Sequence, residues 1–376
     1  MTNLRILIVD ISLRYGGSNS RVLGLMESFP PASIALAALD KSPLMRQAVA
    51  MNLEVYPIAR HKIDPRIPFS LLRLIQQKGF QVLDVQNPQS KLWSSFISRR
   101  AGAALVSTLN SWYEAEYEGN LKGRIYQWIE RMTTSRTDMF IAVSKDIQVH
   151  LKNQNLSKEM VVLIPNAVEM NQDSITADST WLRNRFDLPQ DSRVCTAVGR
   201  LVWAKGYKHL IRAIAQSNDP RLCCVIIGEG RQKKELEEMI KQNSLQERVK
   251  LGGFQEHLQA LKILKSSDIF VMPSLSEGTP ISLLEGAMLG IPIVASRIGG
   301  IPQLVEDRRH ALLVEPGNET ELAEAIDYLL QHPRHATQLA KEARDHVANN
   351  FSRQAQQKAT QAAYLKAIER MHKKIK

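Results

Sequence analysis

The chain has 376 residues, of which 44% are hydrophobic and 23% charged, a balance that excludes wholesale disorder and a fibrous repeat. Its length predicts two or three domains of about 150 residues each. No apolar run reaches the roughly 20 residues that cross a bilayer, and the formal net charge of +11 points to a nucleic acid, an anionic membrane or an anionic substrate as partner.

Short runs rich in Val, Ile and Leu alternate with segments of helical period, which is the pattern of parallel sheets covered by helices. The first run ends in Asp10 and is too short for a signal peptide, so we expect a buried strand and a cytoplasmic protein. The strands expected in the first series are residues 4–10, 32–38, 53–58, 82–86, 104–109, 138–143 and 160–164. We assign them to a first domain, residues 1–170.

A basic loop in this domain precedes an amphipathic helix. Arg60, Lys62 and Arg66 come before the apolar positions that begin at Phe69, within a region, residues 41–110, that holds ten Lys or Arg and three Asp or Glu. The pattern suits a solvated loop with a core-facing helix, or a contact with lipid phosphates on the inner face of a membrane. Both interpretations stay open.

Residues 171–192 are polar and predict a linker, with a short helix at Trp181 to Phe186. The second series of expected strands is 193–199, 222–227, 248–251, 268–272, 291–295 and 310–314, followed by helical sequence from residue 318. We assign residues 193–350 to a second domain and residues 351–376 to a final helix. The expected fold class is therefore α/β, with two Rossmann-like doubly wound domains facing a cleft at the carboxyl ends of their strands.

The cysteines Cys195, Cys223 and Cys224 lack metal-ligand spacing, and two of them are adjacent inside an apolar run. We expect packed thiols rather than disulfides or zinc ligands.

A glycine loop with two cations follows the strand at residues 193–199. Gly199 and Gly206 permit a tight loop, and Arg200 and Lys205 stand before the next helix, an arrangement that suits a diphosphate. The alternative is a surface loop with two solvated cations.

Two carboxylates follow the strand at residues 268–272. Glu277 lies in the loop and Glu285 about one turn into the next helix, and carboxylates accept hydrogen bonds from sugar or ribose hydroxyls. The amides of Gly278, Thr279, Pro280 and Ile281 stand at the helix start, where a phosphate would bind. Acidic residues also collect near helix N-termini for dipole reasons alone.

Two weaker glycine signals are Gly228 with Gly230, after another strand, and Gly17, after the first strand. The first domain lacks the Gly-x-Gly-x-x-Gly pattern, which argues against a nicotinamide or flavin site.

Together these segments resemble the retaining glycosyltransferases of family 4, also described as glycosyl transferases group 1, which have the GT-B fold. The most specific segments are Gly199 to Gly206, Ser276 to Glu285, and Gly290 to Ser296. The resemblance implies that Arg200 and Lys205 bind the donor diphosphate, Glu277 the transferred sugar and Glu285 the ribose. Gly17, Gly199, Gly228, Gly230 and Phe254, with the residues from Gly278 to Ile281, complete the implied donor site, and the final helix would cross back onto the first domain.

The resemblance implies a nucleoside diphosphate sugar as donor and no cofactor. No Asp-x-Asp segment occurs, so the metal clamp of the other large glycosyltransferase fold is missing and we expect a metal-independent reaction.

The chain departs from the family where histidines are expected in the first domain. Asp84, Gln86 and Asn110 stand at those positions. Asn110 donates and accepts hydrogen bonds but takes no proton near neutral pH; we assign it a catalytic position beside the donor sugar. Asp84 is either an acceptor-binding group or a strand-end carboxylate turned to water.

Trp112 and Tyr113, interleaved with carboxylates, suit either a sugar acceptor or a packed lid. The preferred function is transfer of a sugar, with retention, to a glycan or lipid-linked acceptor in the synthesis of a cell-surface polysaccharide or glycolipid such as lipopolysaccharide. The alternatives are a catalytically weak relative acting as a binding subunit, and a nucleotide-sugar 2-epimerase or hydrolase. A nucleic-acid binder is favoured by charge alone, because no nucleic-acid module is recognisable.

Overall fold

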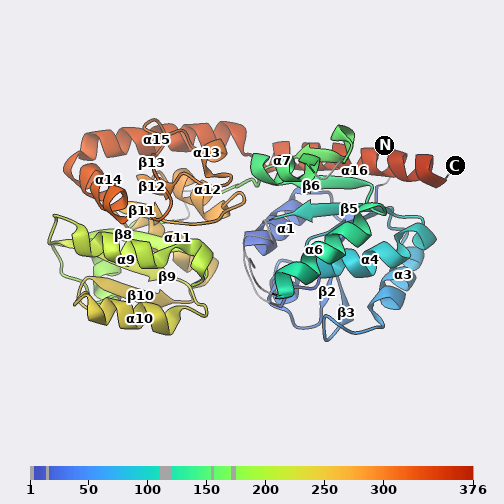
Figure 1. Cartoon of the computed structure of the whole chain (residues 1–376), viewed down its shortest axis with the longest axis horizontal. Coiled ribbons are helices and arrows are strands. Elements are labelled where there is room, and N and C mark those ends of the chain that lie inside the picture. Colours follow the sequence, from blue (N-terminus) through green and yellow to red (C-terminus); the bar gives the residue numbers. More distant parts are fainter. Residues whose placement is uncertain (1–3, 14–16, 111–120, 154–155, 171–174, 376) are drawn as a thin grey trace. The chain divides into compact units, whose positions relative to one another are not determined.

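The computed structural model describes residues 4–13, 17–110, 121–153, 156–170 and 175–375. It divides into two compact units, one of residues 1–167 with 353–376 and one of residues 168–352. Each unit contains one parallel sheet with helices on both faces (Figure 1). The predicted α/β class, with two doubly wound parallel sheets, is confirmed.

The first unit is built on a parallel sheet of seven strands in the order β3-β2-β1-β4-β5-β6-β7. Its strands are β1 (Ile6–Asp10), β2 (Ile34–Leu39), β3 (Val55–Ala59), β4 (Val82–Val85), β5 (Ala104–Leu109), β6 (Met139–Ala142) and β7 (Val161–Leu163). Its helices are α1 (Gly17–Ser28), α2 (Pro43–Ala50), α3 (Ile67–Lys78), α4 (Pro88–Ala101), α6 (Leu121–Thr134), α7 (Lys145–Asn153), the 3₁₀ turn η1 (Lys158–Met160) and α16 (Arg353–Ile375). The chain order reverses between β1 and β4, which is the point where doubly wound sheets bind ligands.

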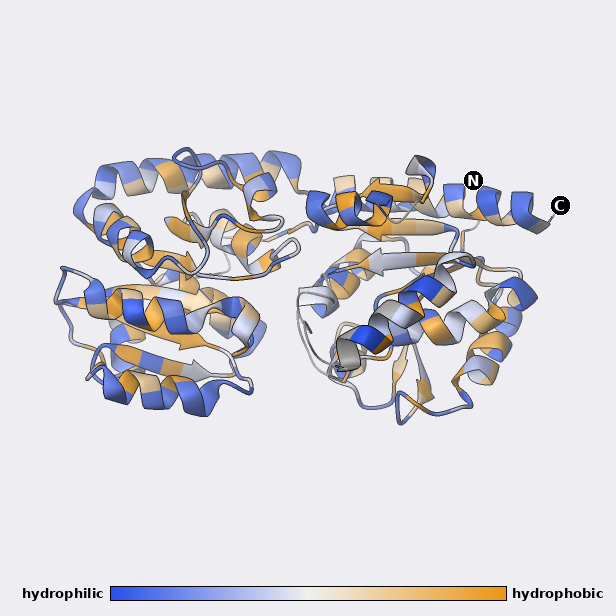
Figure 2. Cartoon of the chain, viewed as in Figure 1, coloured by the Kyte–Doolittle hydropathy of each residue, from blue (hydrophilic) through white to orange (hydrophobic). Residues whose placement is uncertain are grey.

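Strand β1 shows how the sheet acquires two cores. Ile6 and Ile8 pack on one face with α1, α2 and α16, whereas Leu7 and Val9 pack on the other with α3 and α4. Successive side chains of a strand point to opposite faces, so a continuous apolar run buries both. Figure 2 shows these hydrophobic strands between helices that carry hydrophilic residues.

The second unit is built on a parallel sheet of six strands in the order β10-β9-β8-β11-β12-β13. Its strands are β8 (Arg193–Val198), β9 (Leu222–Ile227), β10 (Val249–Gly253), β11 (Ile269–Met272), β12 (Ile293–Ser296) and β13 (Leu312–Val314). Its helices are α8 (Ser179–Arg185), the 3₁₀ turn η3 (Trp203–Lys205), α9 (Tyr207–Gln216), α10 (Lys233–Gln242), α11 (His257–Lys265), α12 (Ile281–Met288), α13 (Ile301–Leu304), α14 (Glu319–Gln331) and α15 (Pro333–Asn350). The reversal here lies between β8 and β11.

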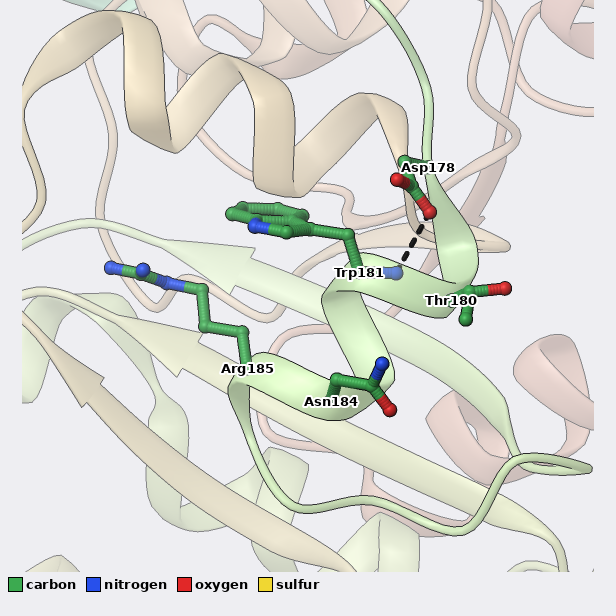
Figure 3. Close-up of a pocket in the computed structure, with 5 residues that line it drawn as sticks. All are labelled: Asp178, Thr180, Trp181, Asn184 and Arg185. Carbon is green, nitrogen blue, oxygen red and sulfur yellow. Dashed lines mark hydrogen bonds between the residues drawn. The ribbon is translucent and has the colours of Figure 1, made fainter.

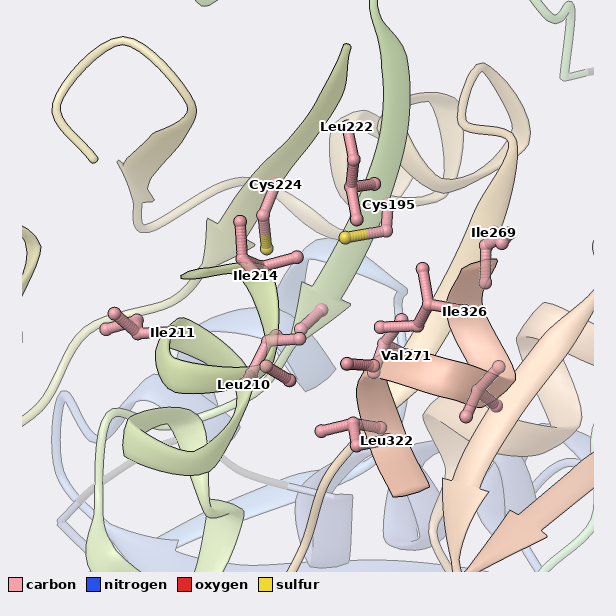
Figure 4. Packing of buried hydrophobic residues seen from close by; sticks show 14 of the residues in the cluster. Cys195, Leu210, Ile211, Ile214, Leu222, Cys224, Ile269, Val271, Leu322 and Ile326 are labelled. Atoms are coloured by element: carbon pink, nitrogen blue, oxygen red, sulfur yellow. The ribbon is translucent and has the colours of Figure 1, made fainter. Parts of the chain in front are cut away.

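One core cluster of the second unit contains two of the three cysteines, and the third, Cys223, lies in another. Cys195 and Cys224 lie among Leu210, Ile214 and other aliphatic side chains of the cluster (Figure 4). All three cysteines are free and buried; burial raises the pKa of Cys223, and a hydrogen bond with Cys195, followed by burial, raises the pKa of Cys224. The prediction of packed thiols is confirmed.

The C-terminal helix α16 belongs to the first unit, which the chain re-enters at Arg353. Its buried residues Ala363, Tyr364, Ala367 and Met371 join the core formed by α1 and the sheet. No helix in the described part of the chain is long and apolar enough to span a membrane.

Candidate functional site

Three loops at the carboxyl ends of β8, β9 and β11 touch through their backbones in the second unit. A Cβ at Gly228, where φ is +142°, would lie 1.9 Å from the carbonyl oxygen of Gly199. A Cβ at Gly206, where φ is +65°, would lie 1.9 Å from the carbonyl oxygen of Pro273. Only glycine fits either position, and the loops therefore form one close-packed platform at the point where the strand order reverses. Gly199 and Gly230 lie on it too.

Lys205 and Glu277 meet on this platform although 72 residues separate them. The Lys205 ammonium donates to Oε1 of Glu277 at 2.5 Å, and the Ser274 hydroxyl donates to the same oxygen at 2.7 Å. Their side chains are 19% and 9% exposed. Glu277 is thereby held in place, while an ammonium has three donors and retains capacity for a second anion. The exposed Arg200 lies in the same loop as Lys205.

Tyr207, the first residue of α9, lies under the loop and was not singled out from the sequence. Its side chain is 2% exposed, and its hydroxyl has no hydrogen-bond partner among the described residues. Burial, and then the charge of Glu277, raise the pKa of this phenol. A Cβ at Gly199 would lie 2.8 Å from the hydroxyl. The feature of the sequence that could have identified Tyr207 is its position directly after Gly206.

Glu285, in α12, accepts a hydrogen bond from His257, the first residue of α11. The distance from Nε2 to Oε1 is 2.7 Å, and the Glu285 side chain is only 12% exposed whereas that of His257 is 55% exposed. Phe254, just after β10, is 57% exposed. His257 was not predicted as a site residue, because nothing in the local sequence marks its proximity to a residue 28 positions away.

The start of α12 carries no side-chain cap, so its first backbone amides have the capacity to bind an anion. Thr279 and Ile281 are buried. Pro280, the N-cap residue, has no backbone N–H, so the expectation that every residue from Gly278 to Ile281 offers an amide is wrong at this position. The Gly278 carbonyl accepts from the amide of Gly300 at 2.9 Å.

Asp84 lies in the interior of the first unit, contrary to both interpretations made from the sequence. The residue is fully buried, with Thr108 donating to Oδ1 and Tyr364 donating to Oδ2, both at 2.7 Å. Burial raises the pKa of its carboxyl group, an effect that the two donors and the nearby Arg21 oppose. The interpretation of a carboxylate turned to water is wrong, and its acceptor-binding assignment is withdrawn because both oxygens are engaged in the interior.

Asn110 follows β5 and lies beside Gln86. Its amide nitrogen donates to Oε1 of Gln86 at 3.2 Å, and its buried Oδ1 has no partner among the described residues. Gly17 is exposed, with no atom within 4 Å of a Cβ placed there. Trp112 and Tyr113 lie outside the described residues.

Asp10 is a further polar residue at the strand ends that was not predicted as a site residue from the sequence. Its Oδ1 accepts from the amide of Ser12 at 2.8 Å and from Nδ2 of Asn87 at 2.9 Å, and burial raises the pKa of the carboxyl group. Its position at the last residue of β1 was the available signal. The carboxyl ends of β1, β4 and β5 thus carry three polar side chains, the buried Asp10 and Gln86 and the half-buried Asn110.

A shallow pocket elsewhere in the second unit contains none of the predicted site residues. It is lined by residues of α8 and its cap, among which Asp178 accepts from the amide of Trp181 at 2.7 Å (Figure 3). Among the residues that the structure describes, no cluster of three or more His, Cys, Asp or Glu has the arrangement of a metal site.

Two family models match successive halves of the chain. The model described as Glycosyltransferase Family 4 matches residues 16–172, and the model described as Glycosyl transferases group 1 matches residues 178–346. The second match contains the platform and Glu285.

Curated relatives and solved structures are similar to this chain at low identity. A 2-deoxystreptamine glucosyltransferase of Streptomyces kanamyceticus is 27% identical over 52% of this chain and 51% of its own length, so the match spans about half of that relative. A UDP-Gal:alpha-D-GlcNAc-diphosphoundecaprenol alpha-1,3-galactosyltransferase of Escherichia coli is 25% identical over 77% of this chain and 76% of its own length. The crystal structure of Anabaena HepE in complex with UDP-glucose has a TM-score of 0.84 at 20% identity, covering 96% of this chain and 99% of the other. That likeness shows the fold.

Proposed function

We propose that this chain, whose two halves match family models of glycosyltransferases, moves a sugar from a nucleoside diphosphate sugar to a glycan or lipid-linked acceptor, with retention and without a metal ion. The names of the relatives support the two substrate classes: HepE is solved with UDP-glucose, and the Escherichia coli relative is named for a diphosphoundecaprenol acceptor. The proposed setting is polysaccharide or lipopolysaccharide synthesis.

The observation that carries the proposal is the contact of Lys205 with Glu277 on the glycine platform. We assign Lys205 and Arg200 to the diphosphate, whose negative charge grows as it leaves the sugar. We assign Glu277 to the sugar hydroxyls, because a carboxylate fixed by Lys205 and Ser274 still has a second oxygen to accept hydrogen bonds. Glu285, oriented by His257, is assigned to the ribose diol.

A base must accept the proton of the acceptor hydroxyl, and the Asn110 amide accepts no proton near neutral pH. We assign this role to the departing phosphate, whose oxygen accepts the proton as the bond to the acceptor forms. Asn110 then acts as a hydrogen-bonding group alone, through the Oδ1 that lacks a partner in the described part of the structure.

The test is a donor screen by saturation-transfer NMR, followed by analysis of the products formed with lipid-linked acceptors. We expect binding of a nucleoside diphosphate sugar and a product with the donor's anomeric configuration. Lys205→Ala should lower turnover by on the order of a hundredfold, as when one preorganised charge stabiliser is removed. Turnover within threefold of wild type would remove Lys205 from the mechanism.

A second candidate is a binding subunit that holds the nucleotide sugar without transferring it. The observation that favours it is Asn110 at the position where the family resemblance implies a histidine. Donor binding without product in the same screen would select this candidate. A free sugar or an epimerised donor as product would instead indicate a hydrolase or a 2-epimerase.

A further inference from the structure

Helix α6 carries apolar side chains on two faces. Tyr126 and Ile129 are buried in the first unit, whereas Ile125, Trp128 and Met132 are 48%, 57% and 51% exposed. The exposed three recur at intervals of three and four residues, so they form one stripe along the outer side of the helix. A stripe of this kind on the surface marks a contact with another apolar phase or partner.

The neighbouring helices continue this surface. Helix α4 packs between α3 and α6 (Figure 1). Phe96 of α4 is 59% exposed, Phe69 of α3 is 73% exposed, and Ile63 in the loop before α3 is 75% exposed. The inner faces of these helices are occupied by Ile67, Leu71, Ile75 and Ile97, which pack on the sheet. The outer apolar residues are therefore not needed for the core.

The same helices hold most of the net positive charge of the chain. Residues 60–78, 88–101 and 124–136 contain eleven Lys or Arg and two Asp or Glu, a surplus of nine out of the total of eleven. The exposed cations among them are Arg60, Arg66, Arg73, Lys78, Arg100, Arg124, Arg131 and Arg136. One of the two acids, Glu130, pairs with the buried Lys91, and the other, Asp64, pairs with Arg66.

Apolar and cationic side chains alternate over this surface rather than forming separate patches. Arg136 lies over the ring of Phe96, with its guanidinium carbon 5.8 Å from the ring centroid. Aromatic rings prefer the boundary between lipid headgroups and acyl chains, while long basic side chains reach the phosphates from the same depth. A nucleic acid would satisfy the charges but would leave the aliphatic members Ile63, Ile125 and Met132 without a partner.

We propose that α3, α4, α6 and the loop before α3 form a membrane-docking surface for bilayers with anionic phospholipids. The apolar side chains enter the headgroup boundary and the arginines bind the lipid phosphates, each cation near the surface adding to the attraction. The other interpretation made from the sequence was a solvated loop followed by a helix that packs only on the core. It does not account for the exposed aromatic residues of α3 and α4 or for the apolar stripe on α6.

The experiment is flotation of the full chain with vesicles of zwitterionic phospholipid, with and without an equal part of phosphatidylglycerol. We expect binding to the anionic vesicles only, weakening as salt screens the charges. Arg73→Glu with Arg100→Glu and Arg131→Glu should lower the partition coefficient by at least about tenfold. Its matched control reverses three exposed cations of the second unit, Lys234→Glu, Lys241→Glu and Arg334→Glu, and should retain most of the binding.

The apolar contribution is tested separately. Phe69→Ser with Trp128→Ser should lower binding severalfold even at low salt, whereas Val49→Ser with Val149→Ser, at residues 55% and 54% exposed, should not. Trp128 fluorescence should also be quenched by brominated phosphatidylglycerol, a signal that Trp128→Phe removes.

Three results would overturn the proposal. The first is an equal loss of binding in the variants of the membrane-docking surface and in their controls, and the second is the absence of vesicle binding. The third is that the variants of this surface change only the binding of a nucleic acid or the self-association of the chain, and leave vesicle binding unchanged.

Discussion

Glu277 is held by two donors on a single oxygen, and this geometry separates its proposed role from that of Glu285. Lys205 and Ser274 bind Oε1 of Glu277, whereas Glu285 is bound by His257 at another part of the second unit. If Glu277 contacts the sugar and Glu285 the ribose, removing Glu277 should affect the transfer of the sugar, whereas removing Glu285 should affect the binding of the nucleotide.

Glu277→Ala should abolish transfer and leave the affinity for the free nucleoside diphosphate nearly unchanged, because the lost partner is the sugar. Glu285→Ala should weaken nucleoside diphosphate binding by on the order of tenfold, the effect of about one lost charged hydrogen bond. Calorimetry with the nucleoside diphosphate, run beside a transfer assay, measures both. The reverse pattern would refute the two assignments.

Asn110 distinguishes an active enzyme from a binding subunit. Asn110→Ala should raise the activation barrier by about 1–3 kcal/mol, because the group that meets its Oδ1 would be left unpaired. Wild type should show no break in the rate near pH ~6.5 from this position, since an amide does not titrate there. Asn110→His should retain measurable transfer.

The kinetic assay over a pH series supplies the check for Asn110. Transfer that appears only in Asn110→His, from a wild type that binds donors but transfers nothing, would establish the binding subunit. Undiminished transfer by Asn110→Ala would place the residue outside the reaction.

At the scale of elements, the contact between α15 and the segment after α13 contains a stacked pair of histidines, of which His310 is buried and His346 half-buried. His310 and His346 stack with ring centroids 4.3 Å apart, and Nδ1 of His310 accepts from the amide of Glu306 at 3.1 Å. Burial lowers the pKa of both imidazoles. Protonation of the His310 acceptor nitrogen would remove the hydrogen bond, and protonation of both rings would place two cations in contact.

This pair predicts an acid-sensitive second unit. The pKa of each histidine is lower in the folded state than its ordinary 6.5, so the unfolded state binds more protons and the free energy of unfolding falls as the pH drops below that value. Urea unfolding at pH 7.5 and at pH 5.5 should show the loss in wild type and a smaller loss in His346→Gln. The exposed His335→Gln is the matched control, and an equal loss in all three proteins would contradict the assignment.

At the scale of the whole molecule, the chain leaves the first unit near residue 167 and returns to it at Arg353. The returning helix α16 buries Tyr364 and Ala367 completely in the first core. A chain ending at Ser352 should therefore lose the thermal transition of the first unit and retain nucleoside diphosphate binding, because every proposed donor contact of the second unit lies within residues 168–352. Calorimetric melting with and without ligand measures both; an unchanged first transition would contradict the prediction.

Much of the architecture was predictable from local patterns. The expected strands at residues 104–109 and 222–227 coincide with β5 and β9, and the others differ at their ends by at most a few residues. Apolar runs of this length bury both faces of a strand wherever they lie in a parallel sheet, so the pattern itself specifies the element. The glycine loops were predictable for a related reason, because strand ends in such sheets converge on one edge.

The side-chain partners were decided by tertiary structure alone. Asp84 reads as a polar strand end, but Tyr364, 280 residues later, covers it, and no local pattern shows which returning helix will seal a face. The pairing of His257 with Glu285 and the outward stripe of α6 have the same origin. Periodicity determines which side chains share one face of a helix or strand, because neighbouring residues along the chain set the backbone dihedral angles. What that face meets depends on segments distant in the sequence, and this is why the elements could be predicted while the burial of Asp84 and the exposure of Trp128 could not.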